Sequence, residues 1–195
     1  MKVFVVFCHP SKDSFTYSIY KSFTKGLREN GHTIVVSDLY EMGFHTDISE
    51  EEYLRETYYK ADGYKTSDVV TEQEKIQSSD AIVFIYPVFW TEAPAKLVGW
   101  FDRVWTTGFA YNPNPTMKIL DKALFIACAG KSIESLVETG ELQAMETVML
   151  GDRIRGRAKE KQMVVYDNIT HWNEAIREQN APKHIEAAYH LGKMF

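Results

Sequence analysis

Aromatic and polar side chains gather in one short segment whose residue types suit the binding of a flat ring. Phe89, Trp90, Thr91 and Glu92 follow the apolar run from 81 to 85 and precede a helical pattern. Aromatic faces combined with free backbone groups are typical of sites for planar ring systems that form hydrogen bonds along their edges. We therefore expect this segment to bind a flat heterocycle.

A polar loop near the start of the chain suits a different chemical group. It runs from 9 to 14, contains His9, and ends at Ser14, where four-residue spacing of apolar side chains predicts the start of a helix. The first N–H groups of a helix have no partner within it, and the helix dipole places positive charge there. We expect this loop to bind a phosphate group.

Strands and helices must position both segments, and the rest of the chain alternates between the two patterns. Strands are expected at 2–8, 33–37, 81–85, 123–127 and 163–166. Helices are expected at 14–30, at 71–78 with capping-box spacing from Thr71 to Glu74, at 94–105, along 133–149 with Gly140 as a weak point, and from 175 to 191 with an interruption at 180–182. The alternation predicts an α/β fold in which helices cover both faces of an open parallel sheet.

The expected strand order brings the two segments together. In the doubly wound order 2-1-3-4-5, a crevice forms between strands 1 and 3 at their carboxyl ends. Loops 9–14 and 88–93 meet at this crevice, and loop 127–132 lies beside it. A phosphate at one end and a planar hydrogen-bonding ring at the other describe a flavin nucleotide. The glycine-rich fingerprints of other nucleotide sites, G-x-G-x-x-G after strand 1 and G-x-x-x-x-G-K-[ST], do not occur.

Composition excludes several other classes of function. The 195 residues fit one domain spanning 1–195, and the formal net charge of −5 argues against electrostatic binding of nucleic acid. No apolar run approaches the ~20 residues of a membrane span, so we expect a cytoplasmic protein without an integral membrane segment. Cys8 and Cys128 end strands that a third strand separates, at about 10 Å, which predicts free thiols. The histidines show no metal-ligand spacing, so no metal site is expected.

The central segment resembles the signature of a known family. The shared residues are Tyr86, Pro87, Trp90, Pro94, Ala95, Leu97, the run 99–104 (GWFDRV) and the run 108–111 (GFAY). They resemble the flavodoxin-like NAD(P)H:quinone oxidoreductases, the NAD(P)H dehydrogenase (quinone) family. The resemblance implies a flavodoxin-like three-layer α/β/α sandwich around a five-stranded parallel sheet of order 2-1-3-4-5.

The same resemblance assigns residues to a flavin site. The phosphates would be held by His9, Ser14, Phe15 and Thr16. The isoalloxazine edge would be held by Pro87, Val88, Phe89, Trp90 and Thr91. The Thr-Gly-Gly segment usual after strand 4 would be replaced by Cys128, Ala129 and Gly130. The resemblance further implies FMN or FAD as cofactor, NAD(P)H as donor, a quinone or similar acceptor, a homodimer and ping-pong kinetics. No catalytic side chain is expected, because the flavin carries the hydride.

Departures from the family pattern leave other functions open. Thr16 replaces the usual asparagine, and the family's tyrosine and histidine after strand 4 are missing between Lys131 and Gln143. The alternative is a regulatory flavin-binding subunit of a glutathione-gated potassium-efflux transporter with weak reductase activity. A third possibility is an interaction domain without flavin. Thr91 and Glu92 predict a more polar pocket than the family's.

Three further groups of side chains have competing interpretations. The basic run from 153 to 161 could bind the 2′-phosphate of NADPH, but we favour a solvated loop or dimer contact at the opposite edge of the sheet. Trp100, Phe101 and Trp105 fall at helical spacing and predict core or subunit interface. The pair 58–59 of tyrosines could belong to the core, a partner surface or a pocket wall.

Overall fold

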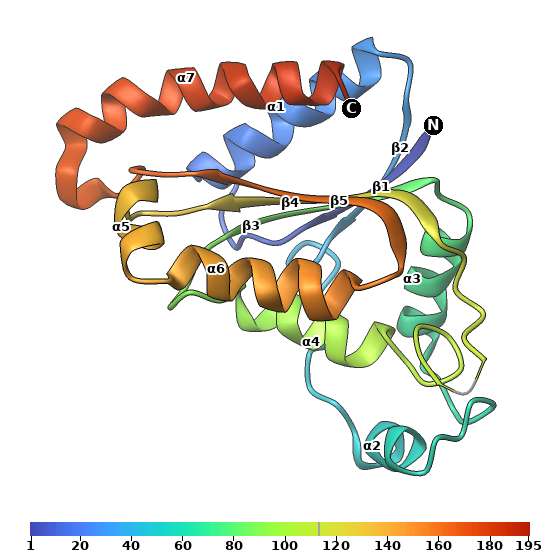
Figure 1. Ribbon diagram of the computed structural model, residues 1–195. Helices are drawn as coiled ribbons and strands as arrows, with labels where there is room; N and C mark the ends of the chain where they lie inside the picture. The colour runs from blue at the N-terminus through green and yellow to red at the C-terminus, as the bar shows by residue number, and fades with distance from the viewer. Residues whose placement is uncertain (113) are drawn as a thin grey trace.

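A five-stranded parallel sheet forms the centre of the computed structural model, which describes residues 1–112 and 114–195 (Figure 1). Its strands are β1 (Lys2–Phe7), β2 (Thr33–Asp38), β3 (Ala81–Pro87), β4 (Leu120–Cys128) and β5 (Ala158–Tyr166). They lie in the order β2-β1-β3-β4-β5, and every neighbouring pair is parallel. The predicted strand order is confirmed.

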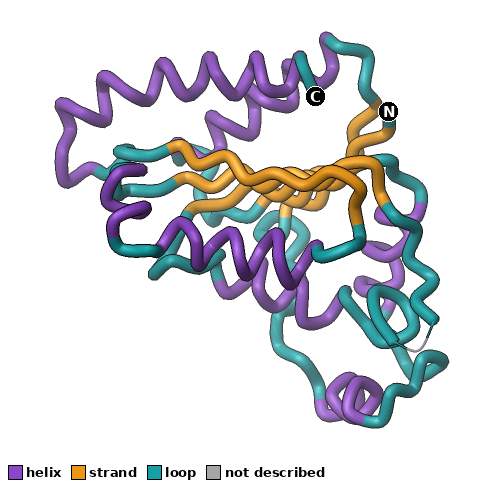
Figure 2. Tube along the Cα trace, viewed as in Figure 1, coloured by secondary structure: helices purple, strands orange, loops and turns teal. Residues whose placement is uncertain are grey.

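Helices cover both faces of this sheet, as Figures 1 and 2 show. One layer contains α1 (Phe15–Glu29) and α7 (Glu174–Lys193); the other contains α3 (Ser67–Gln77), α4 (Ala95–Val104), α6 (Glu141–Glu146) and the π-helix η1 (Thr147–Ile154). The remaining helices are α2 (Glu50–Thr57), which projects away from the sheet, α5 (Ile133–Glu138) at the end of β4, and the short 3₁₀ helix η2 (His171–Asn173).

The core lies in two layers because side chains alternate along each strand. On β3, Ile82, Phe84 and Tyr86 pack toward α4, while Val83 and Ile85 pack toward α1 and α7. All five are fully buried, as expected for a strand covered on both faces. Burial of this strand therefore fixes the position of the loop that follows it.

The start of the helix before β3 differs from the sequence prediction. The predicted capping box at Thr71 is wrong, because α3 already begins at Ser67 and Glu72 lies inside it. Glu72 is buried and accepts hydrogen bonds from the Ser37 hydroxyl at 2.8 Å and the Trp100 indole at 2.8 Å. The carboxylate therefore serves the core, and the capping box is found at Ser49 of α2 instead.

The helices after β4 and β5 also differ from expectation. Gly140 has φ of +75° and separates α5 from α6, so the single helix predicted along 133–149 is wrong. The predicted interruption at Pro182 is wrong too, because α7 continues through it. The last part of α7 packs closely on α1: a Cβ on Gly192 would lie 2.2 Å from the Phe23 carbonyl oxygen, and one on Gly26 would lie 2.2 Å from the Tyr189 carbonyl oxygen.

Several predictions about single residues are confirmed. Cys8 and Cys128 are free thiols. Trp100, Phe101 and Trp105 are buried in the core beneath the sheet. Tyr58 and Tyr59, in contrast, are exposed next to α2 and take no part in the core.

Two negative findings apply to the part of the chain that is described, residues 1–112 and 114–195. No helix there has both the length and the apolar composition needed to cross a bilayer. Nor do histidine, cysteine and carboxylate side chains gather there into a group of three that could hold a metal ion.

Candidate functional site

The loops after β1, β3 and β4 lie at one end of the sheet, beside the start of α5 (Figure 1). β1 and β3 are direct neighbours, and β4 pairs with β3 so that Pro87 stands opposite Cys128. Every site residue predicted from the sequence belongs to one of these loops, to the last residue of β3 or β4, or to the first turn of α1. Parallel topology thus places them at the same edge.

The first turn of α1 offers unpaired backbone donors. Ser14 caps the helix: its hydroxyl accepts from the Tyr17 N–H at 3.1 Å and donates to the Ser11 carbonyl at 2.8 Å. Within residues 1–112 and 114–195, the N–H groups of Phe15 and Thr16 have no acceptor. Two free N–H groups at the positive end of a 15-residue helix form an anion site.

The ring of His9 is tied to the loop beside that turn. Nδ1 of His9 lies 2.9 Å from the Ser11 N–H and 3.0 Å from the Ser11 carbonyl oxygen, so it accepts from Ser11 in one tautomer and donates to Ser11 in the other. Burial lowers the pKa of His9, which favours the neutral ring. Among the described residues Nε2 has no hydrogen-bond partner, so it is available to a ligand.

The segment after β3 forms a tight turn with unusual backbone angles. Phe89 and Glu92 exchange hydrogen bonds of 2.8 and 2.9 Å, and the two residues between them have positive φ, 52° at Trp90 and 65° at Thr91. Positive φ at both central residues defines a type I′ turn, which normally requires glycine or asparagine. Each non-glycine residue in this region costs on the order of 1–2 kcal/mol, and strain of this kind concentrates at functional sites.

The turn leaves donors and an aromatic face exposed. No acceptor is found among the described residues for the N–H groups of Trp90 and Thr91. The side chain of Trp90 is 100% exposed and that of Phe89 is 48% exposed. Exposure of a whole tryptophan costs hydrophobic free energy, which indicates that this ring has a binding role.

The loop after β4 contributes mainly backbone. Cys128 and Ala129 are buried, and the Cys128 carbonyl accepts from Val88 at 2.9 Å, which ties this loop to the turn. Burial raises the pKa of the Cys128 thiol to about 12, so it stays protonated beside the buried Thr16 hydroxyl. Gly130 is exposed. The side chains of Thr16 and Cys128 therefore face the interior rather than the crevice.

Sequence reasoning missed two residues beneath the turn. Tyr86 is buried, its hydroxyl has no partner among the described atoms, and its pKa is raised by burial and by the charge of Glu92. Arg153 places a guanidinium nitrogen 3.8 Å from the Glu92 carboxylate and stacks on Phe101 at 4.6 Å. The expectation that the whole basic run lies at the far edge is therefore wrong for Arg153. No local pattern links 92 with 153, so only the folded chain reveals the pair.

These features fit a flavin nucleotide. The free donors at the start of α1, with the His9 ring beside them, suit a phosphate. The N–H groups of Trp90 and Thr91, next to an exposed indole, suit the polar edge and face of an isoalloxazine ring. The structure brings together the predicted residues of loops 9–14, 88–91 and 128–130, with Thr16 and Cys128 limited to backbone contacts.

Comparisons with known proteins agree with this fold. A family model described as "Flavodoxin-like fold" matches residues 1–153. An NAD(P)H:quinone oxidoreductase from Methanothermobacter marburgensis is 42% identical, with a TM-score of 0.88, over 98% of this chain and 96% of that one. An FMN complex of an FMN-dependent NADH-azoreductase from Bacillus anthracis, at 18% identity and a TM-score of 0.66 over 98% of this chain and 99% of that one, shows the fold alone.

Among curated proteins, NAD(P)H dehydrogenase [quinone] 1 of Cavia porcellus is 36% identical over 123 residues, which are 56% of this chain and 45% of that protein. The chain spans about half the length of the curated relatives it matches. The match of the family model over most of the chain, together with the close relative of similar length, shows that the chain belongs to the flavodoxin-like family that includes the NAD(P)H:quinone oxidoreductases.

Proposed function

We propose that this protein is a flavin-dependent NAD(P)H oxidoreductase that passes two electrons to a quinone or a similar acceptor. The observation that carries the proposal is the strained turn at Trp90 and Thr91, whose free N–H groups lie at the same sheet edge as the free donors of α1. A flavin held there would supply the hydride chemistry. The relatives named quinone reductases support the same conclusion.

Each part of the site has a distinct role in this proposal. Ser14 fixes the start of α1, so that the N–H groups of Phe15 and Thr16 and the ring of His9 bind phosphate. The N–H groups of the turn hydrogen-bond the ring edge, while the Trp90 ring packs beside the flavin plane. Cys128 and Ala129 hold the turn in place through the backbone.

The finer assignments are part of the proposal. We infer one domain over 1–195, FMN or FAD as cofactor, and NADH or NADPH as donor. A homodimer is supported by the exposed Phe89 and Trp90, since apolar side chains at a crevice mouth are commonly covered by a second copy. A reducing compartment such as the cytoplasm is supported by the free thiols of Cys8 and Cys128.

The regulatory alternative finds no support among the relatives, which are named as oxidoreductases. A missing tyrosine and histidine after β4 remain compatible with slow turnover. Lys131, the first residue of the stretch from which they are missing, is paired with Glu141 at 2.6 Å. It supplies a positive charge near the turn, because the Thr91 hydroxyl also contacts Glu141.

The test is an anaerobic visible spectrum of the purified chain loaded with FMN or FAD, before and after NADPH or NADH. Rapid bleaching of a flavin band, followed by recovery on adding a quinone, is the expected result. Ser14→Ala should weaken flavin binding by about fivefold, because loss of a helix cap costs about 1 kcal/mol. Ser18→Ala, one turn later on α1, is the matched control and should bind as the wild type does. Failure to bind either flavin would refute the site.

A further inference from the structure

Glu92, the last residue of the turn after β3, faces a cation from a distant element. Its Oε1 accepts from the Ala93 N–H at 2.8 Å, and its Oε2 lies 3.8 Å from Nη2 of Arg153, near the end of η1. The Glu92 side chain is 41% exposed, whereas that of Arg153 is only 14% exposed. Within residues 1–112 and 114–195, no other cation forms an ion pair with Glu92. The charge at the end of the turn is therefore compensated by one largely buried arginine.

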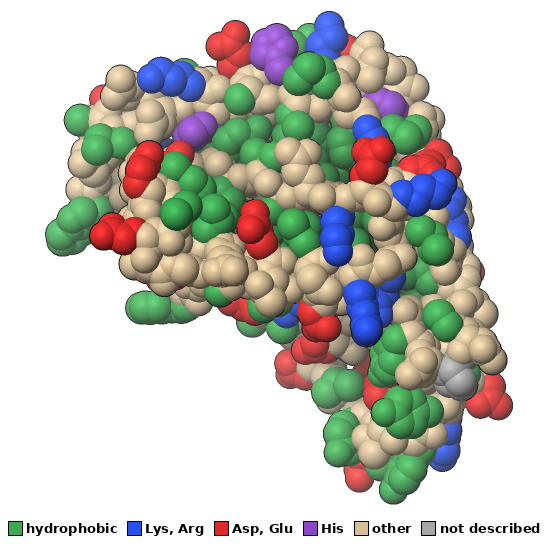
Figure 3. Space-filling model, viewed as in Figure 1, with side chains coloured by type: hydrophobic (Ala, Val, Ile, Leu, Met, Phe, Trp, Pro, Cys, Tyr) green, Lys and Arg blue, Asp and Glu red, His purple; other side chains and the backbone are tan. Residues whose placement is uncertain are grey.

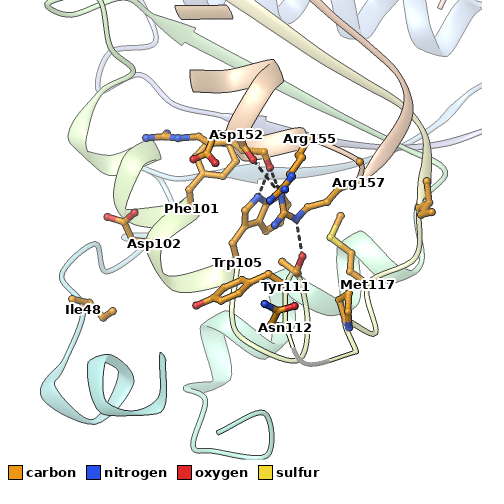
Figure 4. Close-up of a pocket in the computed structure, with 15 residues that line it drawn as sticks. Ile48, Phe101, Asp102, Trp105, Tyr111, Asn112, Met117, Asp152, Arg155 and Arg157 are labelled. Atoms are coloured by element: carbon orange, nitrogen blue, oxygen red, sulfur yellow. Dashed lines mark hydrogen bonds between the residues drawn. The ribbon is translucent and has the colours of Figure 1, made fainter. Parts of the chain in front are cut away.

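Arg153 is held in place by α4. Its guanidinium carbon lies 4.6 Å from the centre of the Phe101 ring, and its backbone carbonyl accepts from the Trp105 indole at 2.7 Å. Figure 4 shows Phe101 and Trp105 extending from α4 toward the end of η1, beside a hollow that Arg153 also lines. A cation that is stacked on an aromatic face and anchored through its backbone keeps one orientation. The position of the positive charge is therefore set by the core and not by the turn.

The geometry of the pair contributes little to stability. A separation of 3.8 Å is too long for a hydrogen bond, and Nη1 of Arg153 is buried with no partner among the described atoms. The hydroxyl of Tyr86 is buried without a described partner too, and the charges of Glu92 and Arg153 both act on its pKa, so it lies near them. Buried charges and unmade hydrogen bonds cost free energy that apolar side chains of similar size would not. An arginine at this position therefore indicates a role for its charge.

Arg153 also acts on a second carboxylate. Burial raises the pKa of Asp102 on α4, the charge of Arg153 lowers it, and the charge of Glu92 raises it. Figure 3 shows acidic and basic side chains interspersed on the surface over α6, η1 and the start of β5, so no broad field of one sign dominates this face. Local compensation decides the potential beneath the turn. Without Arg153, Glu92 and Asp102 would leave net negative charge there.

We propose that Arg153 is a positioning residue of the proposed flavin site, where its charge cancels that of Glu92 so that the turn accepts a ring that becomes anionic on reduction. This inference rests on the proposed flavin-dependent function. Glu92 holds the junction between the turn and α4, because its carboxylate accepts the Ala93 N–H. Two-electron reduction of flavin at neutral pH adds negative charge to the ring, and an uncompensated carboxylate next to Thr91 would oppose it. Arg153 lets the turn keep this carboxylate without repelling the reduced ring.

The reduction potential of bound flavin tests this proposal, because it reports the ratio of the affinities for reduced and oxidised flavin. In Arg153→Met this ratio should fall about fivefold, which lowers the two-electron potential by about 20 mV. In Glu92→Gln, whose amide oxygen can still accept from the Ala93 N–H, the ratio should rise by a similar factor, because the charge of Arg153 is then uncompensated. The double variant should return to within about twofold of the wild type. Loss of a merely structural contact would shift both single variants in the same direction.

Two further variants complete the experiment. Arg153→Lys keeps the charge and should stay closer to the wild-type potential than Arg153→Met does. The matched control is Lys159→Met, which removes an exposed positive charge at the start of β5 and should leave the potential unchanged. If Arg153→Met does not fold, Glu92→Gln carries the test alone, because Glu92 is partly exposed.

The outcomes separate this inference from the proposed function. The inference is overturned if flavin binds but the two single variants shift the potential in the same direction, or if neither shifts it more than Lys159→Met does. In that case the proposed function stands. Absence of flavin binding by the wild type overturns the proposed function and this inference together.

Discussion

Replacement of Thr91 by glycine measures the strain in the turn after β3. Thr91 has φ of 65°, in a region that costs a residue with a Cβ about 1–2 kcal/mol. Glycine removes this cost but adds about 0.5–1 kcal/mol of chain entropy on folding. The expected net gain is about 0.5–1 kcal/mol in the free energy of unfolding, or roughly 1–4 °C in melting temperature for a chain of this size.

Thr91→Ala is the matched control for this experiment. Both substitutions remove the hydroxyl that contacts Glu141, but alanine keeps the Cβ and therefore the strain. Differential scanning calorimetry of the flavin-free proteins should place Thr91→Gly above Thr91→Ala. Equal melting temperatures, or a lower value for glycine, would refute the argument that the backbone is strained here.

The same pair of variants tests what the strain is for. A glycine turn samples more conformations, so the free N–H groups of 90 and 91 would be less well ordered before binding. We expect Thr91→Gly to bind flavin severalfold more weakly than Thr91→Ala, despite its greater stability. A stabilised variant with unchanged flavin affinity would mean that the turn geometry does not contribute to binding.

Other predictions concern the core, the acid range and the charge beside the turn. Arg103→Met should destabilise the fold by about 3–5 kcal/mol, measured by urea titration. The reason is that Glu52, which is buried and 2.9 Å from Arg103, loses its cation. The control is Arg28→Met, at an exposed position of α1, which should change the stability little. Burial alone would raise the pKa of Glu52, but hydrogen bonds from Ser49 and Arg103 hold it below its usual value. The stability that ionised Glu52 contributes is therefore fully present above its unfolded-state pKa of about 4.3. It is lost as the pH falls below about 4.3 and through the lower pKa that Glu52 has in the folded protein. Over this acid range the wild type should lose more stability than Arg103→Met does. Glu141→Gln should leave the charge of Lys131 unpaired and raise the reduction potential of bound flavin by roughly 20 mV, which corresponds to about 1 kcal/mol for two electrons. The potential is measured by dye-linked titration. A lower potential in the variant would contradict the placement of Lys131 near the ring.

The strand order and the location of the site could be predicted because they depend on local patterns. The unbroken apolar run at 81–85 identifies a strand buried on both faces, and serine at 14 before four-residue apolar spacing identifies the start of α1. Once these elements alternate, chain topology alone places their loops at one edge. The resemblance of the 86–111 segment adds the expected ligand.

Other features depend on tertiary contacts that no local pattern records. Pro182 normally ends a helix, yet α7 continues through it and packs closely on α1 at Gly26 and Gly192. The guanidinium of Arg153 reaches Glu92 from a distant part of the chain. The turn at Trp90 contains neither glycine nor asparagine, so its I′ geometry has no signature in the sequence. Strained sites are expected to escape prediction, since they contradict local preference.

The contacts around the turn explain how it keeps this geometry without a ligand. Two residues at positive φ cost about 2–4 kcal/mol together. Phe89 and Glu92 exchange hydrogen bonds, Val88 donates to Cys128, and the Ala93 N–H donates to the Glu92 carboxylate at 2.8 Å; each such bond contributes about 1 kcal/mol net. Cys128 belongs to β4, which is packed in the core, so this contact ties the strained turn to a rigid neighbour. The edge proposed to bind flavin is therefore preformed, and ligand binding at this edge needs little ordering of the backbone.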